Sequence, residues 1–125
     1  MTRSLPQAPL ILIVEDDVWQ RLAASEMFEG AGYRVLAAAS ADEAMVIFEG
    51  NSDIKLLFTD VSMAGSMDGA ELVRRVAVRW PKIATIITSG RFRPEPLPQN
   101  TRFHAKPYMP ADVLKHAREL TTDLS

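Results

Sequence analysis

The sequence has no cysteine among its 125 residues, which excludes disulfide bonds and thiolate metal sites. No apolar run approaches the ~18 residues of a membrane-spanning helix, and residues 1–9 lack the apolar stretch of a signal peptide. Neither sign of charge dominates: 14 basic and 16 acidic side chains leave a net charge of −2, which argues against a dedicated nucleic-acid-binding domain. Glycine-rich phosphate-binding loops are missing too, which argues against nucleotide binding. We therefore expect one soluble, cytoplasmic domain with a single core.

The chain alternates between short apolar segments and longer segments that begin with helix caps. Short apolar runs predict strands at Leu10–Val14, Tyr33–Ala38, Ile54–Thr59, Ile83–Ile87 and Arg102–Ala105. Helices are predicted at Trp19–Glu29, from a capping box at 40–43 through Phe48, at Gly69–Trp80 with Asp68 as its N-cap, and at Pro110–Leu120. Repeated strand–helix units imply an α/β fold with a mainly parallel sheet, right-handed crossovers and helices on both faces.

The segment Gly90–Asn100 breaks this alternation. It contains Pro94, Pro96 and Pro98, and an interior proline costs a helix about 3 kcal/mol. We therefore predict no regular helix between the fourth and fifth strands. The domain is expected at 10–120, between flexible tails at 1–9 and 121–125.

Chemically distinctive side chains lie at the carboxyl ends of four predicted strands. Glu15 and Asp16 follow the first strand, Asp60 the third, Thr88 the fourth and Lys106 the fifth. Ligands of open parallel sheets bind beyond these ends, so we expect the five side chains to form one site. Like charges ~5 Å apart repel by about 3 kcal/mol at an effective dielectric constant near 20. We therefore expect a bound cation to stabilise the three carboxylates. The set suits a phosphoryl group carried on a carboxylate beside Mg²⁺.

Each residue of this set has a candidate role. Asp16 and Asp60 are candidate direct ligands of Mg²⁺, and Glu15 is a candidate ligand through water. Asp60 is also the candidate nucleophile that takes up a phosphoryl group as an aspartyl phosphate. An Asx turn at the strand end is the alternative interpretation of Asp60 taken alone. Lys106 would offer that group a positive charge, and Thr88 would offer a hydroxyl hydrogen bond.

Other polar residues near these segments are interpreted as structural. Asp17 is placed as the N-cap of the first helix rather than as a metal ligand. His104 and His116 have no partner at ligand spacing in the sequence, and we assign them neither a phosphohistidine nor a metal role.

From Leu10 to about Leu120, this ordered set of motifs resembles a response-regulator receiver domain. The matching pieces are, in chain order, Ile-Val-Glu15-Asp16-Asp17, Thr59-Asp60-Val-Ser-Met63, Met67-Asp68-Gly69, Ile-Ile-Thr88-Ser89-Gly90 and Phe103-His-Ala-Lys106-Pro107-Tyr108. The resemblance implies a flavodoxin-like, doubly wound, five-stranded parallel sheet in the order 2-1-3-4-5. It also implies that Asp60 is the phosphoacceptor and that Thr88 and Lys106 sense the phosphoryl group.

The same resemblance implies a metal site and a switch residue. Glu15 and Asp16 would form an acidic pocket, and the backbone carbonyl of Ser62 would complete the Mg²⁺ shell together with Asp60. Phe103 takes the position of the switch aromatic residue.

Three features depart from the family pattern. Ala64 stands where a proline is usual, so the loop after Asp60 is expected to be less rigid. Phe103 lacks the hydroxyl of the commoner tyrosine, so switching cannot use a hydrogen bond there. The connection from Thr88 to Lys106 is short and rich in proline, so the fourth helix of the family is expected to be degraded or missing.

The expected function is that of a stand-alone receiver in a two-component phosphorelay. A sensor histidine kinase or a histidine phosphotransfer protein would donate the phosphoryl group to Asp60, and the output would pass to an unknown downstream protein. No catalysis beyond phosphotransfer and dephosphorylation of the domain itself is expected, and no contact with nucleic acid or membrane. We expect a monomer, or a dimer that uses other surfaces than the family. A domain cut from a hybrid kinase would have nearly the same sequence.

Two alternatives belong to other functional classes. The first is a protein-interaction module on the same fold that works without phosphorylation, against which the complete set of acids, Thr88 and Lys106 argues. The second is a small Mg²⁺-dependent phosphatase with an aspartyl nucleophile. Such an enzyme would need a second acid two residues after Asp60, where this chain has Ser62.

Overall fold

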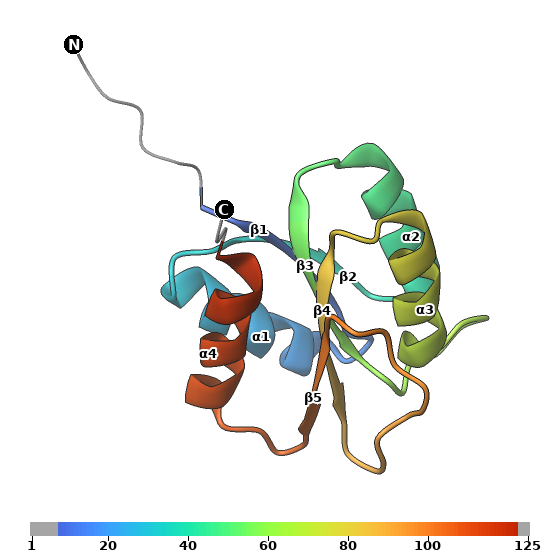
Figure 1. The fold of residues 1–125 in the computed structure, drawn as a ribbon. Coiled ribbons are helices and arrows are strands. Elements are labelled where there is room, and N and C mark those ends of the chain that lie inside the picture. Colours follow the sequence, from blue (N-terminus) through green and yellow to red (C-terminus); the bar gives the residue numbers. More distant parts are fainter. Residues whose placement is uncertain (1–7, 123–125) are drawn as a thin grey trace.

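Five parallel strands form one sheet in the order β2-β1-β3-β4-β5, which confirms the predicted topology (Figure 1). The computed structural model describes residues 8–122, so most of both predicted tails, at 1–7 and 123–125, lies outside the described residues. The strands are β1 (Leu10–Val14), β2 (Arg34–Ala38), β3 (Ile54–Asp60), β4 (Ala84–Ser89) and β5 (Thr101–Ala105). The helices are α1 (Val18–Gly30), α2 (Ala41–Gly50), α3 (Gly69–Arg79) and α4 (Pro110–Thr121).

Two helical layers enclose the sheet, with α1 and α4 on one face and α2 and α3 on the other (Figure 1). β1 is an interior strand and is buried along its whole length. Ile11 and Ile13 join the core cluster beneath α1 and α4, whereas Leu10, Leu12 and Val14 join the cluster beneath α2 and α3. Each of these side chains contributes roughly 1.5–3 kcal/mol by leaving water. A strand covered on both faces therefore needs the unbroken apolar run that the sequence has here.

All three predicted N-caps are confirmed. In each of them the cap side chain accepts a hydrogen bond from the backbone N–H three residues later: Asp17 from Gln20 (2.9 Å), Ser40 from Glu43 (3.1 Å) and Asp68 from Glu71 (2.9 Å). A cap of this kind satisfies one of the free N–H groups of the first turn and is worth about 1 kcal/mol.

Element boundaries differ from the predicted ones by one or two residues. The largest shifts are at β4, which runs on to Ser89, and at α2, whose last residue is Gly50. β4 is longer because Thr88 and Ser89 pair with His104 and Ala105 of β5. Thr88 is therefore held inside a strand and not in the loop after it.

The segment Gly90–Asn100 contains no helix, which confirms the prediction made from its prolines. It is nevertheless attached to the domain at several points. Pro94 is buried, Arg74 Nε of α3 donates to the Pro96 carbonyl at 3.2 Å, and Asn100 Nδ2 donates to the Ile83 carbonyl at 2.8 Å. The segment is therefore irregular but anchored at its middle and at its end.

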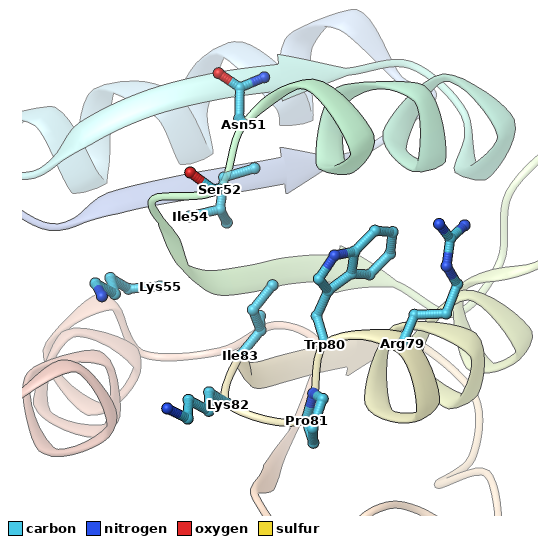
Figure 2. A pocket seen from close by; sticks show the side chains of 9 residues that line it. All are labelled: Asn51, Ser52, Ile54, Lys55, Arg79, Trp80, Pro81, Lys82 and Ile83. Carbon is cyan, nitrogen blue, oxygen red and sulfur yellow. The ribbon is translucent and has the colours of Figure 1, made fainter.

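The turn between α3 and β4 lies at the amino end of β4, whereas the predicted site lies at the carboxyl ends of the strands. Figure 2 shows the residues of this turn. Trp80 caps α3, and its ring stacks on Phe48 of α2 with the ring centroids 5.2 Å apart. Pro81 follows and cannot continue the helix, because it has no N–H to donate. None of the helices within residues 8–122 is long and apolar enough to cross a membrane.

Candidate functional site

Parallel pairing brings the carboxyl ends of β1, β3 and β4 to one edge of the sheet. Asp60, the last residue of β3, pairs in register with Thr88 of β4. On the other side of β3, Val14 pairs with Thr59, so Glu15 directly follows the strand that flanks Asp60. The register of the sheet therefore assembles residues that are far apart in the sequence, as expected for this edge.

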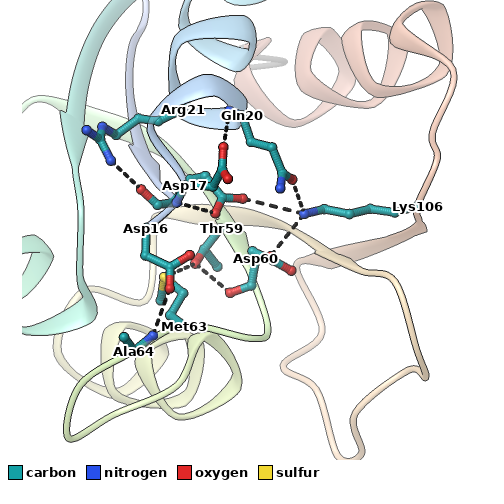
Figure 3. Close-up of polar contacts among 10 residues, drawn as sticks. Asp16, Asp17, Gln20, Arg21, Thr59, Asp60, Met63, Ala64 and Lys106 are labelled. Carbon is teal, nitrogen blue, oxygen red and sulfur yellow. Dashed lines mark hydrogen bonds and ion pairs between the residues drawn. The ribbon is translucent and has the colours of Figure 1, made fainter.

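The Lys106 ammonium group joins two carboxylates and one side-chain amide (Figure 3). Its Nζ lies 2.9 Å from Asp60 Oδ2, 3.4 Å from Glu15 Oε1 and 2.6 Å from Gln20 Oε1. The Asp60 side chain is only 11% exposed and that of Lys106 23%, so solvent screens this ion pair less than a pair on the open surface. Lys106 is the group that holds the two acids together.

Burial and charge act in opposite directions on the pKa values of this cluster. Burial raises the pKa of Glu15 above its usual 4.5, although the Asp17 N–H and the Lys106 charge lower it. The carboxyl of Asp16 and the charge of Asp60 add to the increase. Burial alone would lower the pKa of Lys106, but the hydrogen bond and charge of Asp60, with the charge of Glu15, outweigh it and raise that pKa above 10.5. Lys106 is therefore firmly cationic at neutral pH.

Asp16 turns toward the loop after β3 (Figure 3). Its Oδ2 accepts a hydrogen bond from the backbone N–H of Ala64 at 2.9 Å, and this bond holds the pKa of Asp16 below its usual 3.8. A proline at position 64, as in the family pattern, would have no N–H to donate. Alanine at position 64 therefore allows a contact between Asp16 and the loop that proline would not make.

The start of α3 packs directly on the backbone of Asp60. A Cβ atom added at Gly69 would lie 1.8 Å from the Asp60 carbonyl oxygen, and the Gly69 N–H donates to the Val61 carbonyl at 2.8 Å. Only glycine permits so close an approach. Thr59 Oγ1 donates to the same Asp60 carbonyl at 3.0 Å, so the backbone that carries the Asp60 carboxylate is fixed from two sides.

Thr88 and Ser62 border the Asp60 carboxylate in different ways. Thr88 is buried and lines a cavity of about 100 Å³ together with Glu15, Asp60 and Lys106. Ser62 is exposed and lines a cleft of about 470 Å³ to which Asp60 and Lys106 also belong. Both residues therefore lie where the sequence predicts them, although their roles toward a ligand remain predictions.

Phe103 does not enter this cavity. Its partner in β4 is Ile87, and its half-buried ring packs against the core beneath α2 and α3. The Arg93 guanidinium, from the irregular segment, lies 6.0 Å from the centroid of the Phe103 ring. Its assignment as a switch residue stays a prediction.

The carboxylate and carbonyl oxygens of this site suit Mg²⁺ better than a metal that must be coordinated by protein side chains alone. Within residues 8–122, no three histidine, aspartate or glutamate side chains gather closely enough to form a metal site by themselves. Mg²⁺ keeps several waters and is commonly held by one or two carboxylates and a phosphate, so it needs no such cage. Burial raises the pKa of Glu15, and the Asp16 carboxyl and the Asp60 charge add to the increase, so a divalent cation beside these acids would favour their charged forms. Asp16, Asp60 and the Ser62 carbonyl would hold it, with Glu15 acting through water.

The sequence prediction missed two contacts that the structure contains. Gln20 is not among the residues predicted for the site, yet its side chain accepts a hydrogen bond from Lys106. Its place in the first turn of a helix that follows a strand end is a signal that could have indicated this contact. His104 and His116 were given no partner, but His104 Nε2 lies 2.8 Å from His116 Nδ1. Burial and the neighbouring His116 charge lower the pKa of His104 below 6.5. No sequence spacing indicates this contact, because it joins a strand to a helix.

Comparisons with known proteins agree with this fold. A family model described as the response regulator receiver domain matches residues 11–117. Over 80 residues the chain is 31% identical to the hydrogenase transcriptional regulatory protein HoxA of Cupriavidus necator, a match that covers 64% of this chain but only 16% of that protein.

Solved structures give the same result. The chain is similar to the receiver domain of the hybrid histidine kinase CckA, with 28% identity, a TM-score of 0.78, and 90% of this chain and 99% of that chain covered. A response regulator receiver protein from Sinorhizobium medicae WSM419 shares the fold, with 22% identity, a TM-score of 0.84, and 92% and 95% covered. Since the family model spans most of its length, the chain belongs to the response regulator receiver domain family.

Proposed function

We propose that this receiver domain accepts a phosphoryl group on Asp60 from a phosphohistidine, in a reaction that needs Mg²⁺. The observation that carries the proposal is the ion pair between Asp60 Oδ2 and Lys106 Nζ at 2.9 Å, at the edge of the sheet where Thr88 is the register partner of Asp60. A carboxylate that is nearly buried, beside a cation and a hydroxyl, is suited to become an acyl phosphate. The donor would be a sensor histidine kinase or a histidine phosphotransfer protein in the cytoplasm.

The transfer step would use side chains of this cluster. An Asp60 carboxylate oxygen forms the new O–P bond while the P–N bond of the donor breaks, and the donor imidazole leaves with the electron pair of that bond. Lys106 lies where it can neutralise charge on the transferring phosphoryl oxygens. When bound at Asp16 and Asp60, Mg²⁺ supplies positive charge to the same oxygens.

Phosphorylation would change the state of the domain by charge. An acyl phosphate adds about −1.5 to −2 charges at a site where Lys106 now serves two carboxylates. Thr88 and Lys106 would move toward this charge and bias an equilibrium between two conformations. The segment Gly90–Asn100 begins two residues after Thr88 and contains no helix, so it is the part of the domain expected to change most.

Output would pass to a second protein. The region between β4 and β5 has no helix, so it lacks one element of the surface through which receiver domains usually dimerise. This supports a monomer, or a dimer built from other surfaces, with and without the phosphoryl group.

The test is labelling with a small acyl-phosphate donor, followed by intact mass spectrometry. With Mg²⁺ present, one phosphoryl mass should be added, and both chelation and Asp60→Asn should abolish it. Asp112→Asn changes an exposed aspartate of α4 and should be labelled like the unchanged protein. Full labelling of Asp60→Asn would contradict the assignment of the phosphoacceptor. A protein that takes up no label, yet binds its partner, would support the phosphorylation-independent alternative.

A further inference from the structure

A second hollow lies at the end of the sheet opposite Asp60. It is formed where α2 leads into β3 and where α3 leads into β4, and its volume is about 350 Å³ (Figure 2). Ile54 and Ile83 begin or precede the two strands and are buried, and Trp80 and Pro81 complete an apolar wall. Pockets of this size with a mostly apolar lining are typical of sites for small molecules.

All the charged residues that line this pocket are basic. Lys55, Arg79 and Lys82 line it, and no acidic residue does. The two lysines are exposed and lie on one side of the pocket, with Arg79 on the other side beyond Trp80 (Figure 2). Among the described residues, neither lysine has an ion-pair partner, whereas Arg79 is paired with Glu49 at 2.7 Å. A chain with a net charge of −2 thus has an uncompensated cationic hollow.

Two acids in or next to the segments that line the pocket are already paired with arginines. Asp53 lies between two lining segments in the sequence, but its carboxylate is 3.3 Å from the Arg34 guanidinium. Glu49 holds Arg79, whose guanidinium also lies 4.5 Å from the centroid of the Trp80 ring. Arg79 therefore stiffens the wall of the pocket, and Lys55 and Lys82 remain available to a ligand.

From this arrangement we propose that the pocket binds a small amphipathic anion, with an apolar body of one or two rings and a carboxylate head group. The body would contact Ile54, Trp80 and Ile83, and the carboxylate would be attracted by Lys55 and Lys82. The pocket volume fits a small molecule rather than a protein surface, and the uncompensated lysines select for negative charge.

The pocket is also connected to the irregular segment of the domain. Asn100, the last residue of that segment, donates from Nδ2 to the Ile83 carbonyl at 2.8 Å. The same segment begins beside Thr88 at the Asp60 end of the sheet. A ligand at Ile83 would thus lie close to the last residue of the segment that begins two residues after Thr88.

The test uses 1-naphthylacetate as the probe and its neutral amide, 1-naphthylacetamide, as the matched control. Binding is followed by NMR through the two indole N–H signals of the ¹⁵N-labelled protein, which Trp19→Phe assigns. The Trp80 signal should shift saturably with a dissociation constant below about 1 mM, as ordinary ligand efficiency gives for a molecule of this size. The amide should bind at least about tenfold more weakly, and added salt should weaken the acid but not the amide.

Charge variants locate the site. Lys55→Gln combined with Lys82→Gln should weaken naphthylacetate about tenfold. Lys115→Gln, which removes an exposed lysine of α4, should leave the affinity unchanged, and thermal unfolding checks that both variants fold. Equal binding of acid and amide, an equal shift of the Trp19 signal, or no saturable shift at 10 mM probe (roughly ten times the expected constant) would each overturn the proposal. A short acidic peptide that shifts Trp80 where naphthylacetate does not would overturn it too, in favour of a protein partner.

Discussion

Lys106 Nζ lies 2.9 Å from Asp60 Oδ2, although Asp60 ends β3, Lys106 follows β5, and β4 lies between these strands in the sheet. The lysine reaches across the end of β4, where Thr88 lies, and also contacts Glu15 and Gln20. One ammonium group therefore balances two carboxylates in the unphosphorylated domain. A phosphoryl group on Asp60 would compete with Glu15 and Gln20 for the same three N–H donors.

Lys106→Gln should slow phosphorylation of Asp60 without preventing folding. The amide keeps a hydrogen-bond donor but removes the charge that faces the transferring phosphoryl group, a loss worth about a hundredfold in rate. The rate is measured by mass spectrometry with a small acyl-phosphate donor at fixed Mg²⁺. Lys115→Gln is the matched control and should react at the original rate. An unchanged rate in Lys106→Gln would mean that the lysine serves only to stabilise the acids.

Ala64→Pro should strengthen Mg²⁺ binding about two- to fivefold. The substitution removes the N–H that now donates to Asp16 Oδ2, and the free oxygen becomes available to the metal. Isothermal titration with Mg²⁺ measures the effect, and Ala64→Ser, which keeps the N–H, should match the original affinity. Weaker binding in the proline variant would show that the Asp16 contact organises the site instead of competing with the metal.

Gly69→Ala should damage the site and the stability of the domain together. A Cβ there would meet the Asp60 carbonyl at 1.8 Å, so the start of α3 or the end of β3 must move. We expect a loss of about 2–4 kcal/mol in the free energy of unfolding in urea, with reduced labelling of Asp60. Gly50→Ala is the control, because nothing lies within 4 Å of a Cβ there, and it should be neutral or stabilising by about 0.5–1 kcal/mol.

Burial of His104, together with the His116 charge beside it, should make stability depend on pH near neutrality. The folded state lowers the pKa of His104 below 6.5, so the unfolded chain binds more protons and stability rises with pH. The stability that depends on a neutral His104 is fully present above pH 6.5, and it is lost as the pH falls through the lowered pKa of His104. Urea midpoints at pH 7.5 and 5.5 should differ less in His116→Gln than in the unchanged protein. Asp112→Asn should increase the difference, because the Asp112 charge now raises the pKa of His104.

The surface that receives the donor protein is expected at the start of α1. Trp19 is 75% exposed and Leu22 48%, in the turn whose Gln20 contacts Lys106. Trp19→Ala should slow transfer from a phosphohistidine protein at least about tenfold while the small donor reacts as before. Gln20 is unsuitable for this test because its substitution also disturbs Lys106. Val78→Ala, at a site 82% exposed on α3, is the control. Equal slowing with both donors would indicate damage to the site itself.

The sequence by itself determined the order and type of the elements, and it indicated which residues lie together at the carboxyl end of the sheet. Features that depend only on the local sequence could be assigned without the structure. Asp17, Ser40 and Asp68 could be assigned as N-caps, and the apolar run of β1 as a buried strand. The prolines of residues 90–100 likewise excluded a regular helix there. These signals are local, because a cap bonds three residues away and a strand shows its burial in its own composition. The strand ends then indicated one site, since parallel strands share an edge.

Tertiary structure decided which of these side chains touch and in which direction. Asp16 turns to Ala64, Lys106 reaches Gln20 as well as Asp60, and His104 meets His116. Such contacts depend on strand register, helix rotation and side-chain rotamers over separations of 12 to 86 residues, none of which leaves a periodic trace in the sequence. The cationic pocket beside Trp80 has the same origin: its lysines, Lys55 and Lys82, come together only because β3 and β4 begin side by side.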